Sequence, residues 1–184
     1  MADESPIMIC RFSELAGRLG LVPEIDCIFF ESSATKNFES DSDRSAFRER
    51  WLGRYLSNFP QWAYLALARD ESIAGYLVGS LDDPAQTPLF EDIAYFKDWK
   101  ALTQRFPAQL HINVASSRRG QGAGACLVAA FIEDARRAGA PGVHVVTGRG
   151  MRNVRFYDQN GFKEAGALHV NGRELVFLAR TLLD

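Results

Sequence analysis

The sequence predicts a mixed α/β fold, and three observations support this prediction. Apolar runs of strand length recur along the chain, segments with helical spacing lie between them, and hairpin turn signals stand near both ends. The 184 residues are typical of one domain with its own core. The sequence shows neither repeats nor a linker, so we expect a single domain over residues 1–184 with a helical insertion at about 84–107.

Two apolar strands joined by a short turn are the clearest elements of the first half. They cover residues 63–68 and 73–81, and the sequence Arg69-Asp70-Glu71-Ser72 between them predicts a hairpin. Pro60 and Pro107 each end a run with helical spacing. The other expected elements are a strand at 7–12, helices at 13–22, 46–59 and 89–106, and a mobile loop at 31–43.

Turn residues divide the second half. Asn171-Gly172 is the strongest short hairpin signal in the chain, and Gly139 and Gly161 stand where left-handed helix ends are expected. The expected elements are strands at 109–114, 143–147, 162–170 and 174–182, a helix from the glycine-rich turn to 138, and a short helix at 152–159. We expect the strand at 174–182 to lie at the edge of the sheet, which would allow a homodimer as well as a monomer.

Composition excludes several classes of protein. With 47% hydrophobic and 24% charged residues the chain is not disordered, and 21 basic against 23 acidic residues argue against a nucleic-acid binder. No window approaches the roughly 18 apolar residues of a membrane span, and residues 1–5 lack the features of a secretion signal. Cys10, Cys27 and Cys126 form no CxxC pair, so we expect reduced thiols in a cytoplasmic protein.

A glycine-rich turn between the strand at 109–114 and the following helix is the main candidate binding site. It reads Arg118-Arg119-Gly120-Gln121-Gly122-Ala123-Gly124. Alternate glycines let backbone amides approach a ligand, and the helix N-terminus favours an anion. The two arginines add positive charge, so the turn predicts a diphosphate site. The alternative is a turn that only packs the helix on the strand.

Two common phosphate-binding motifs do not fit this turn. A P-loop requires Gly-Lys-Ser/Thr, but Ala125-Cys126 follows Gly124. A dinucleotide fingerprint tolerates Ala125 but needs an acid about 20 residues later. The strand that should carry this acid ends Val146-Thr147-Gly148-Arg149, with no carboxylate.

Two motifs resemble those of the GCN5-related N-acetyltransferase (GNAT) superfamily. Arg119 to Gly124 matches its Arg/Gln-x-x-Gly-x-Gly/Ala signature, and Phe156-Tyr157-Asp158-Gln159-Asn160-Gly161-Phe162 is similar to its second motif. The resemblance covers the whole chain. It implies a mostly antiparallel twisted sheet with two splayed central parallel strands and helices on both faces. Phe106-Pro107-Ala108-Gln109-Leu110-His111-Ile112 also resembles bacterial relatives of the acetyltransferase-like domain of O-linked N-acetylglucosaminidase.

The resemblance implies that acetyl-coenzyme A is the co-substrate and that no metal is needed. In this family the coenzyme lies between the two parallel strands, here 109–114 and 143–147. The positions that match coenzyme-binding positions of the family are Val114 and Ala115 for the pantetheine amides, Arg119, Gly120, Gln121, Gly122, Ala123 and Gly124 for the pyrophosphate, and Phe156 beside the pantetheine arm.

The resemblance also implies an acid and leaves the base open. Tyr157 matches the general acid of the family, because a phenol can protonate the departing thiolate; the alternative is a core tyrosine. We expect His111 to be the base, since imidazole titrates near neutral pH. The alternative is a structural histidine beside Asn113, and Glu91 and Asp92 are further candidates.

Two departures from the family pattern support a second hypothesis. The second motif usually begins with a cofactor-binding Asn, but Gly150 stands there, so Asn153 and Arg152 are candidates to replace it. The strand at 109–114 also lacks an acid. A coenzyme A-binding pseudoenzyme or interaction module with little turnover is therefore the alternative to an N-acetyltransferase, and a dinucleotide or nucleotide-sugar binder is a third.

The acceptor is expected to be a primary amine of a small molecule or peptide, with no nucleic acid or membrane partner. The resemblance places the acceptor walls in residues 22–59, whose acids would attract a cation or be solvated. Aromatic residues at 90–99 would line the acceptor pocket, form a dimer contact, or pack in the core or over the sheet edge.

Overall fold

Seven strands form a mixed sheet in the order β1-β2-β3-β4-β5-β7-β6. The structure is a computed structural model that describes residues 7–183, so the segment 1–5 considered above lies outside it. The pairs β1–β2, β2–β3, β5–β7 and β6–β7 are antiparallel, and β4–β5 is parallel. This confirms the predicted fold class. The strands are β1 Met8–Arg11, β2 Ala63–Leu67, β3 Ile73–Ser80, β4 Ala108–Val114, β5 Gly142–Gly148, β6 Lys163–Val170 and β7 Arg173–Thr181.

The chain divides into two compact units, each described separately below. The first unit contains the chain up to Gly79 and His111–Phe131, and the second contains Ser80–Leu110 and the chain from Ile132.

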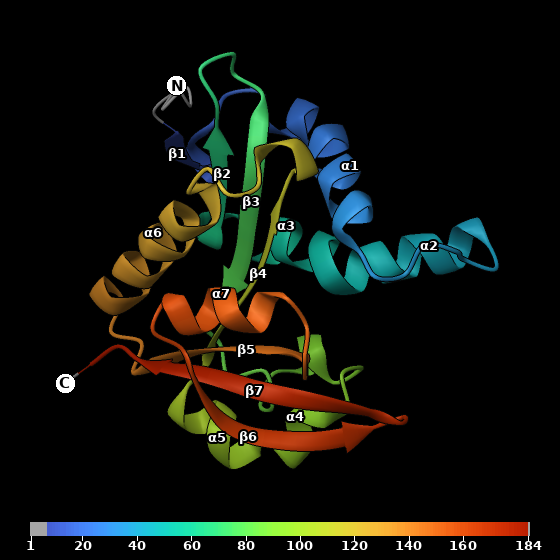
Figure 1. Cartoon of the computed structure of the whole chain (residues 1–184), viewed down its shortest axis with the longest axis vertical. Coiled ribbons are helices and arrows are strands. Elements are labelled where there is room, and N and C mark those ends of the chain that lie inside the picture. The colour runs from blue at the N-terminus through green and yellow to red at the C-terminus, as the bar shows by residue number, and fades with distance from the viewer. Residues whose placement is uncertain (1–6, 184) are drawn as a thin grey trace. The chain divides into compact units, whose positions relative to one another are not determined.

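Helices cover both faces of the sheet in the first unit. They are α1 Val22–Ser32, α2 Asp41–Arg48, a π-helical turn Glu49–Gly53, α3 Arg54–Asn58 and the start of α6 Ala123–Arg137. Tyr64 of β2 lies 6.2 Å from Phe131 of α6, while Tyr76 of β3 lies near Asp26 of α1. Tyr64 is paired with Leu77, and Leu77 and Tyr76 are consecutive residues of β3, so Tyr64 and Tyr76 point to opposite faces of the sheet. The helices α6 and α1 therefore contact opposite faces (Figure 1).

The predicted helix at 13–22 is wrong. This segment forms two 3₁₀ turns, Phe12–Glu14 and Arg18–Leu21, and α1 begins only at Val22. Gly17 has a φ of 67°, which stops a regular helix, whereas Pro23 fits the first turn of α1. The predicted loop at 31–43 is shorter than expected, since Ser40 accepts a hydrogen bond from the Asp43 amide and starts α2.

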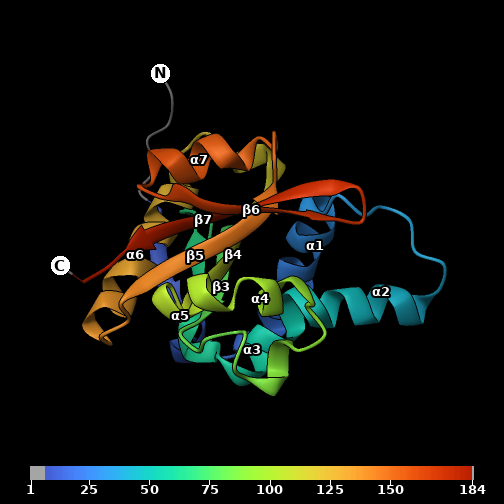
Figure 2. The same cartoon turned by 90° about the horizontal axis from the view of Figure 1, so that it is seen from below.

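The second unit packs helices on both faces of the β5-β7-β6 sheet. Figures 1 and 2 show α7 Asn153–Gln159 on one face and the pair α4 Tyr95–Asp98 and α5 Lys100–Arg105 on the other. Trp99, Phe106 and Phe177 form the core beneath α4 and α5. The predicted continuous helix at 89–106 is broken. Trp99 leaves helical geometry with φ −103° and ψ 19°, and its buried ring packs 5.4 Å from Phe177.

The C-terminal hairpin confirms the predicted Asn171-Gly172 turn, since both residues have positive φ, 49° and 75°. The expected edge position of the strand at 174–182 is wrong, because β7 pairs with both β5 and β6. The edge strand beside β7 is β6. The physical reason is burial: residues 176–179 of β7 are all buried, while β6 alternates exposed and half-buried residues.

No helix in residues 7–183 is long and apolar enough to cross a membrane. The finding concerns the described residues alone.

A buried histidine makes the second unit sensitive to acid. His144 stacks on Phe177 at 4.5 Å, and its Nδ1 donates to the Phe106 carbonyl at 2.6 Å. Burial lowers the pKa of His144 to about 4, below its ordinary value of 6.5. Between these values the unfolded chain binds a proton that the folded chain excludes. Stability is therefore full above about pH 6.5 and falls as the pH drops towards 4.

We expect the free energy of unfolding to fall by on the order of 3 kcal/mol across this window through His144 alone. Urea unfolding at pH 7 and pH 4.5, for the wild type and His144→Leu, measures the effect. Carboxylates also titrate in this range and change the stability of both proteins. The extra loss in the wild type relative to His144→Leu therefore measures the contribution of His144. An equal loss in both proteins would contradict the prediction.

Candidate functional site

The glycine-rich turn leads from β4 into α6 as predicted. A 3₁₀ turn at Ser116–Arg118 follows β4, and α6 begins at Ala123. Gly120 and Gly122 have φ values of 79° and 86°, which side-chain-bearing residues rarely adopt. A Cβ built on either glycine meets no protein atom within 4 Å. The turn therefore needs glycine for its backbone conformation and leaves open space above both residues.

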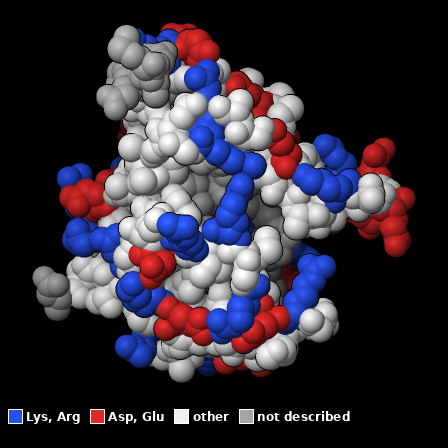
Figure 3. Space-filling view, in the orientation of Figure 1, with Lys and Arg blue, Asp and Glu red and all other residues white. Residues whose placement is uncertain are grey.

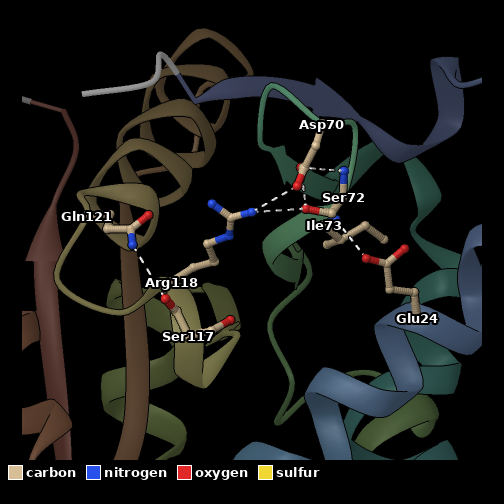
Figure 4. Close-up of polar contacts among 7 residues, drawn as sticks. All are labelled: Glu24, Asp70, Ser72, Ile73, Ser117, Arg118 and Gln121. Carbon is tan, nitrogen blue, oxygen red and sulfur yellow. Dashed lines mark hydrogen bonds and ion pairs between the residues drawn. The ribbon is translucent and has the colours of Figure 1, made fainter. Parts of the chain in front are cut away.

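Protein groups hold both arginines of this turn. Arg118 donates to Asp70 Oδ2 at 3.1 Å and to Ser72 Oγ at 3.5 Å, both in the β2–β3 turn (Figure 4). Arg119 donates from Nε to the Val114 carbonyl at 3.3 Å and from a terminal nitrogen to Ser32 at 3.4 Å. Asp70 offsets part of the charge of Arg118, so Arg119 is the better candidate for an anion.

Side-chain hydrogen bonds also fix the turn to its surroundings. Gln121 Nε2 donates to the Ser117 carbonyl at 3.4 Å (Figure 4). The Glu31 carboxylate at the end of α1 accepts hydrogen bonds from the Ser116 hydroxyl and from the Ser116 amide, the latter at 3.2 Å. These bonds lower the pKa of Glu31. Glu31 is thus an anchor for the turn, a role that no sequence motif predicts.

Two further acids of α1 also have protein partners. Glu24 accepts from the Ile73 amide at 2.8 Å (Figure 4), and Asp26 pairs with Arg48 at 2.8 Å. Both carboxylates therefore bind groups of the protein itself, which reduces the negative charge that they present to an incoming cation. A hollow of about 550 Å³ lies between α1, the start of β3 and the turn after β4, and Cys27 and Arg118 line it.

The two backbone candidates of β4 differ in their hydrogen bonds. The Ala115 amide donates to the Ala74 carbonyl of β3 at 2.9 Å, and the Ala115 carbonyl accepts from the Arg118 amide at 2.9 Å. The single N–H of Ala115 is therefore used, whereas its carbonyl oxygen has a second lone pair that can accept a further hydrogen bond. Because backbone groups alternate sides along a strand, the Val114 amide points away from β3. Val114 is therefore the stronger candidate for a pantetheine contact.

His111 and Asn113 share one face of β4, but each bonds a different tyrosine. His111 Nε2 lies 3.0 Å from the Tyr55 hydroxyl, and Asn113 Nδ2 donates to the Tyr76 hydroxyl at 2.7 Å. His111 therefore has a hydrogen-bond partner in Tyr55, and the alternative of a structural histidine beside Asn113 stays open. Trp51 packs edge-on against His111 with ring centroids 5.5 Å apart. Trp51 and Tyr55 lie in the predicted helix at 46–59, and their helical spacing carries no signal for a contact with His111.

The α1–α2 segment forms a hollow of about 700 Å³ lined by Phe30, Phe38 and Arg44, among others. The Arg44 guanidinium lies 3.6 Å from the centre of the Phe30 ring, and Phe38 packs edge-on against Phe30. Lys36 Nζ donates to the carbonyls of Phe30 and Glu31. Figure 3 shows acidic and basic side chains together at the α2 end, so charge selects neither a cationic nor an anionic acceptor here.

The second-motif residues belong to the second unit. Tyr157 is buried, packs edge-on against Phe156 and Phe162, and burial raises its pKa above the ordinary value of 10.0. The phenol therefore stays protonated at neutral pH. Asn153 Oδ1 accepts from Thr147 Oγ1 at 2.9 Å, which fixes the start of α7 to the end of β5.

Gly150 stands where the second motif usually has an asparagine, and its backbone conformation explains the presence of glycine. Its φ is 77°, in the left-handed region that glycine adopts without strain. The base candidates Glu91 and Asp92 are both exposed in the second unit. No cluster of three or more potential metal ligands is found among residues 7–183.

The predicted site residues thus fall into two groups. The first unit brings together His111, Val114, Ala115 and the turn from Arg119 to Gly124. The second unit holds Asn153, Phe156 and Tyr157 on α7.

Comparisons with known proteins agree with the fold. A family model described as the acetyltransferase (GNAT) family matches residues 29–162. Similar solved structures include SsHAT, with 18% identity over 97% of this chain and 99% of that chain and a TM-score of 0.70. An N-acetyltransferase from Staphylococcus aureus Mu50 shows 17% identity over 97% and 100% with a TM-score of 0.66. The NatC complex bound to Gag peptide and CoA shows 15% identity over 96% and 99% with a TM-score of 0.66. Among curated proteins, none matches this sequence significantly.

Proposed function

The chain belongs to the acetyltransferase (GNAT) family, and on this premise we propose that it is an acetyl-coenzyme A-dependent N-acetyltransferase acting on a primary amine. The observation that carries the proposal is the turn before α6. Gly120 and Gly122 adopt left-handed conformations with open space above them, at the N-terminus of a 15-residue helix. Such a turn offers backbone amides and a helix dipole to a diphosphate.

Coenzyme A fits the groups present in the first unit. Gly120, Gly122 and the first amides of α6 would bind the pyrophosphate, and Arg119 would add a charge-assisted hydrogen bond. The Val114 amide would pair with the pantetheine arm. The NatC structure named above was solved with CoA, which supports the same cofactor for this fold.

In the proposed reaction the amine attacks the thioester carbonyl directly. His111 accepts a proton from the acceptor ammonium, so that a neutral amine can form the new C–N bond. A backbone amide near Val114 polarises the thioester carbonyl as negative charge develops on its oxygen. The C–S bond then breaks, and the Tyr157 phenol donates its proton to the thiolate. The new amide nitrogen loses its extra proton to solvent, from which the phenol is reprotonated. Burial raises the pKa of Tyr157, so the phenol carries its proton when the thiolate leaves.

A ligand-stabilisation experiment tests the cofactor first. Coenzyme A at about 100 times its dissociation constant should add roughly 2.7 kcal/mol to the stability of the protein. NAD at the same concentration should add nothing. Stabilisation by NAD and not by coenzyme A would instead support the dinucleotide-binding alternative.

An assay of thiol release tests the reaction itself. Acetyl-coenzyme A is mixed with a panel of primary amines: a lysine-containing peptide, a peptide with a free N-terminus, spermidine and phenethylamine. Amine-dependent release of free thiol, with the acetylated amine found by mass spectrometry, is the expected result.

A coenzyme A-binding module with little turnover is the second candidate. Its specific support is β4, which carries His111 and Asn113 but no carboxylate base, together with Gly150 in place of an asparagine. Tight binding of coenzyme A without thiol release to any amine would favour this candidate.

A further inference from the structure

Two aromatic side chains of the first unit, Tyr55 and Trp51, pack against His111. The imidazole Nε2 lies 3.0 Å from the Tyr55 hydroxyl, and the two rings meet edge-on with centroids 5.2 Å apart. Trp51 makes a second edge-on contact with the imidazole at 5.5 Å. Tyr55 is fully buried, whereas His111 and Trp51 are half-buried. The imidazole therefore meets a fixed hydroxyl in the interior and keeps partial access to solvent.

The chain fixes these two aromatic side chains through its helical segment. Trp51 and Tyr55 are four residues apart and so project from the same side of the run that contains the π turn. A side chain at Gly53 would meet the Glu49 carboxylate, which would have to move aside. Arg48, just before the turn, donates to Asp26 of α1 at 2.8 Å. This ion pair anchors the start of the run that carries Tyr55.

We propose that Tyr55 is a positioning residue for His111, a role that rests on the proposed function of His111 as the proton acceptor. The hydroxyl fixes the plane of the imidazole. Of the two arrangements that satisfy the contact, the proposal requires the one in which Nε2–H donates to the Tyr55 hydroxyl, because it leaves the lone pair of the base on Nδ1. Trp51 restricts rotation of the same ring. When an ammonium arrives, its N–H bond breaks and the proton moves to an imidazole nitrogen that is already oriented.

A double-mutant cycle on turnover tests the coupling. Thiol release is measured at saturating acetyl-coenzyme A with the fastest amine of the panel, for the wild type, Tyr55→Phe, His111→Asn and the double variant. Tyr55→Phe should lower kcat roughly tenfold and leave the KM for acetyl-coenzyme A within about twofold. In the His111→Asn background, Tyr55→Phe should change kcat no further. An equal loss in both backgrounds would overturn the proposal, because it would show that Tyr55 acts on structure alone.

Tyr76→Phe is the matched control. It removes a hydroxyl from another buried tyrosine that bonds a β4 side chain, since Tyr76 accepts from Asn113 at 2.7 Å. Both variants should lower the melting temperature by similar amounts, but Tyr76→Phe should keep kcat within about twofold. If Tyr55→Phe does not fold, Trp51→Phe replaces it in the cycle, with a smaller loss of kcat that also disappears with His111→Asn.

A spectroscopic readout separates this proposal from the proposed function. The chain has three histidines, so ¹H–¹⁵N correlation spectra with His111→Asn as the assignment variant identify the His111 ring. The wild type should show one ring tautomer, and Tyr55→Phe should show averaged ¹⁵N shifts. Averaged shifts in the wild type would overturn the positioning role even in an active enzyme. The absence of thiol release with any amine would overturn the proposed function and leave the tautomer result standing.

Discussion

Tyr157→Phe should lower kcat by roughly 10²–10⁴-fold, the usual contribution of a general acid, without weakening the binding of coenzyme A. The substitution removes only the hydroxyl, and the edge-on contacts of the ring with Phe156 and Phe162 remain. The thiolate would then leave without a proton from the protein. Thiol release and calorimetric titration with coenzyme A measure the two quantities separately.

Tyr95→Phe is the control for this experiment. It also removes a phenol hydroxyl from the second unit, but Tyr95 lies on α4 against Trp99. This variant should keep kcat within about twofold. Unchanged turnover in Tyr157→Phe would show that Tyr157 is not the general acid. Weaker binding of coenzyme A would instead show that Tyr157 contributes to binding the coenzyme.

Gly122→Ala should weaken coenzyme A binding by roughly 10–100-fold, which corresponds to about 1.5–3 kcal/mol for a lost charge-assisted hydrogen bond. The φ of 86° strains any residue with a side chain, and the new methyl group would point into space that no protein atom occupies. The backbone amides would therefore move, or the methyl group would exclude the diphosphate. Isothermal titration with coenzyme A gives the dissociation constant.

Gly139→Ala separates backbone strain from ligand exclusion. Gly139 follows α6, has a φ of 82° and likewise has no protein atom near a built Cβ. Both variants should lose a similar free energy of unfolding, about 1–2 kcal/mol. Only Gly122→Ala should bind coenzyme A more weakly. Equal affinity in the two variants would show that the turn does not bind the diphosphate.

The sequence predicts well the parts of the fold that short-range chemistry decides. The hairpin at Asn171-Gly172 and the helix end at Gly139 follow from residues that tolerate positive φ, and the structure confirms both. The start of α1 was predicted wrongly because the apolar spacing at 13–22 fits a helix, while Gly17 and Pro23 decide where one forms. The spacing of apolar residues alone does not show that Gly17 stops a helix and that Pro23 allows one to begin.

The site was less predictable, because its contacts join residues far apart in the sequence. Tyr55 and His111 are separated by 56 residues, and Glu31 and Ser116 by 85. No periodicity connects such pairs, so the partners of His111 could not be found from β4 alone. The turn at 120–124 was predictable because its chemistry depends on adjacent glycines and on the helix that follows.

The bond from Arg118 to the β2–β3 turn decides where this protein can be extended for engineering. Asp70 and Ser72, at the tip of that hairpin, hold an arginine of the turn that precedes α6. A peptide tag inserted between Asp70 and Glu71 would displace this support, although the tip is exposed. The β6–β7 tip at Asn171-Gly172 is equally exposed and belongs to the other unit. Labels and fusion partners are therefore better placed at that second tip.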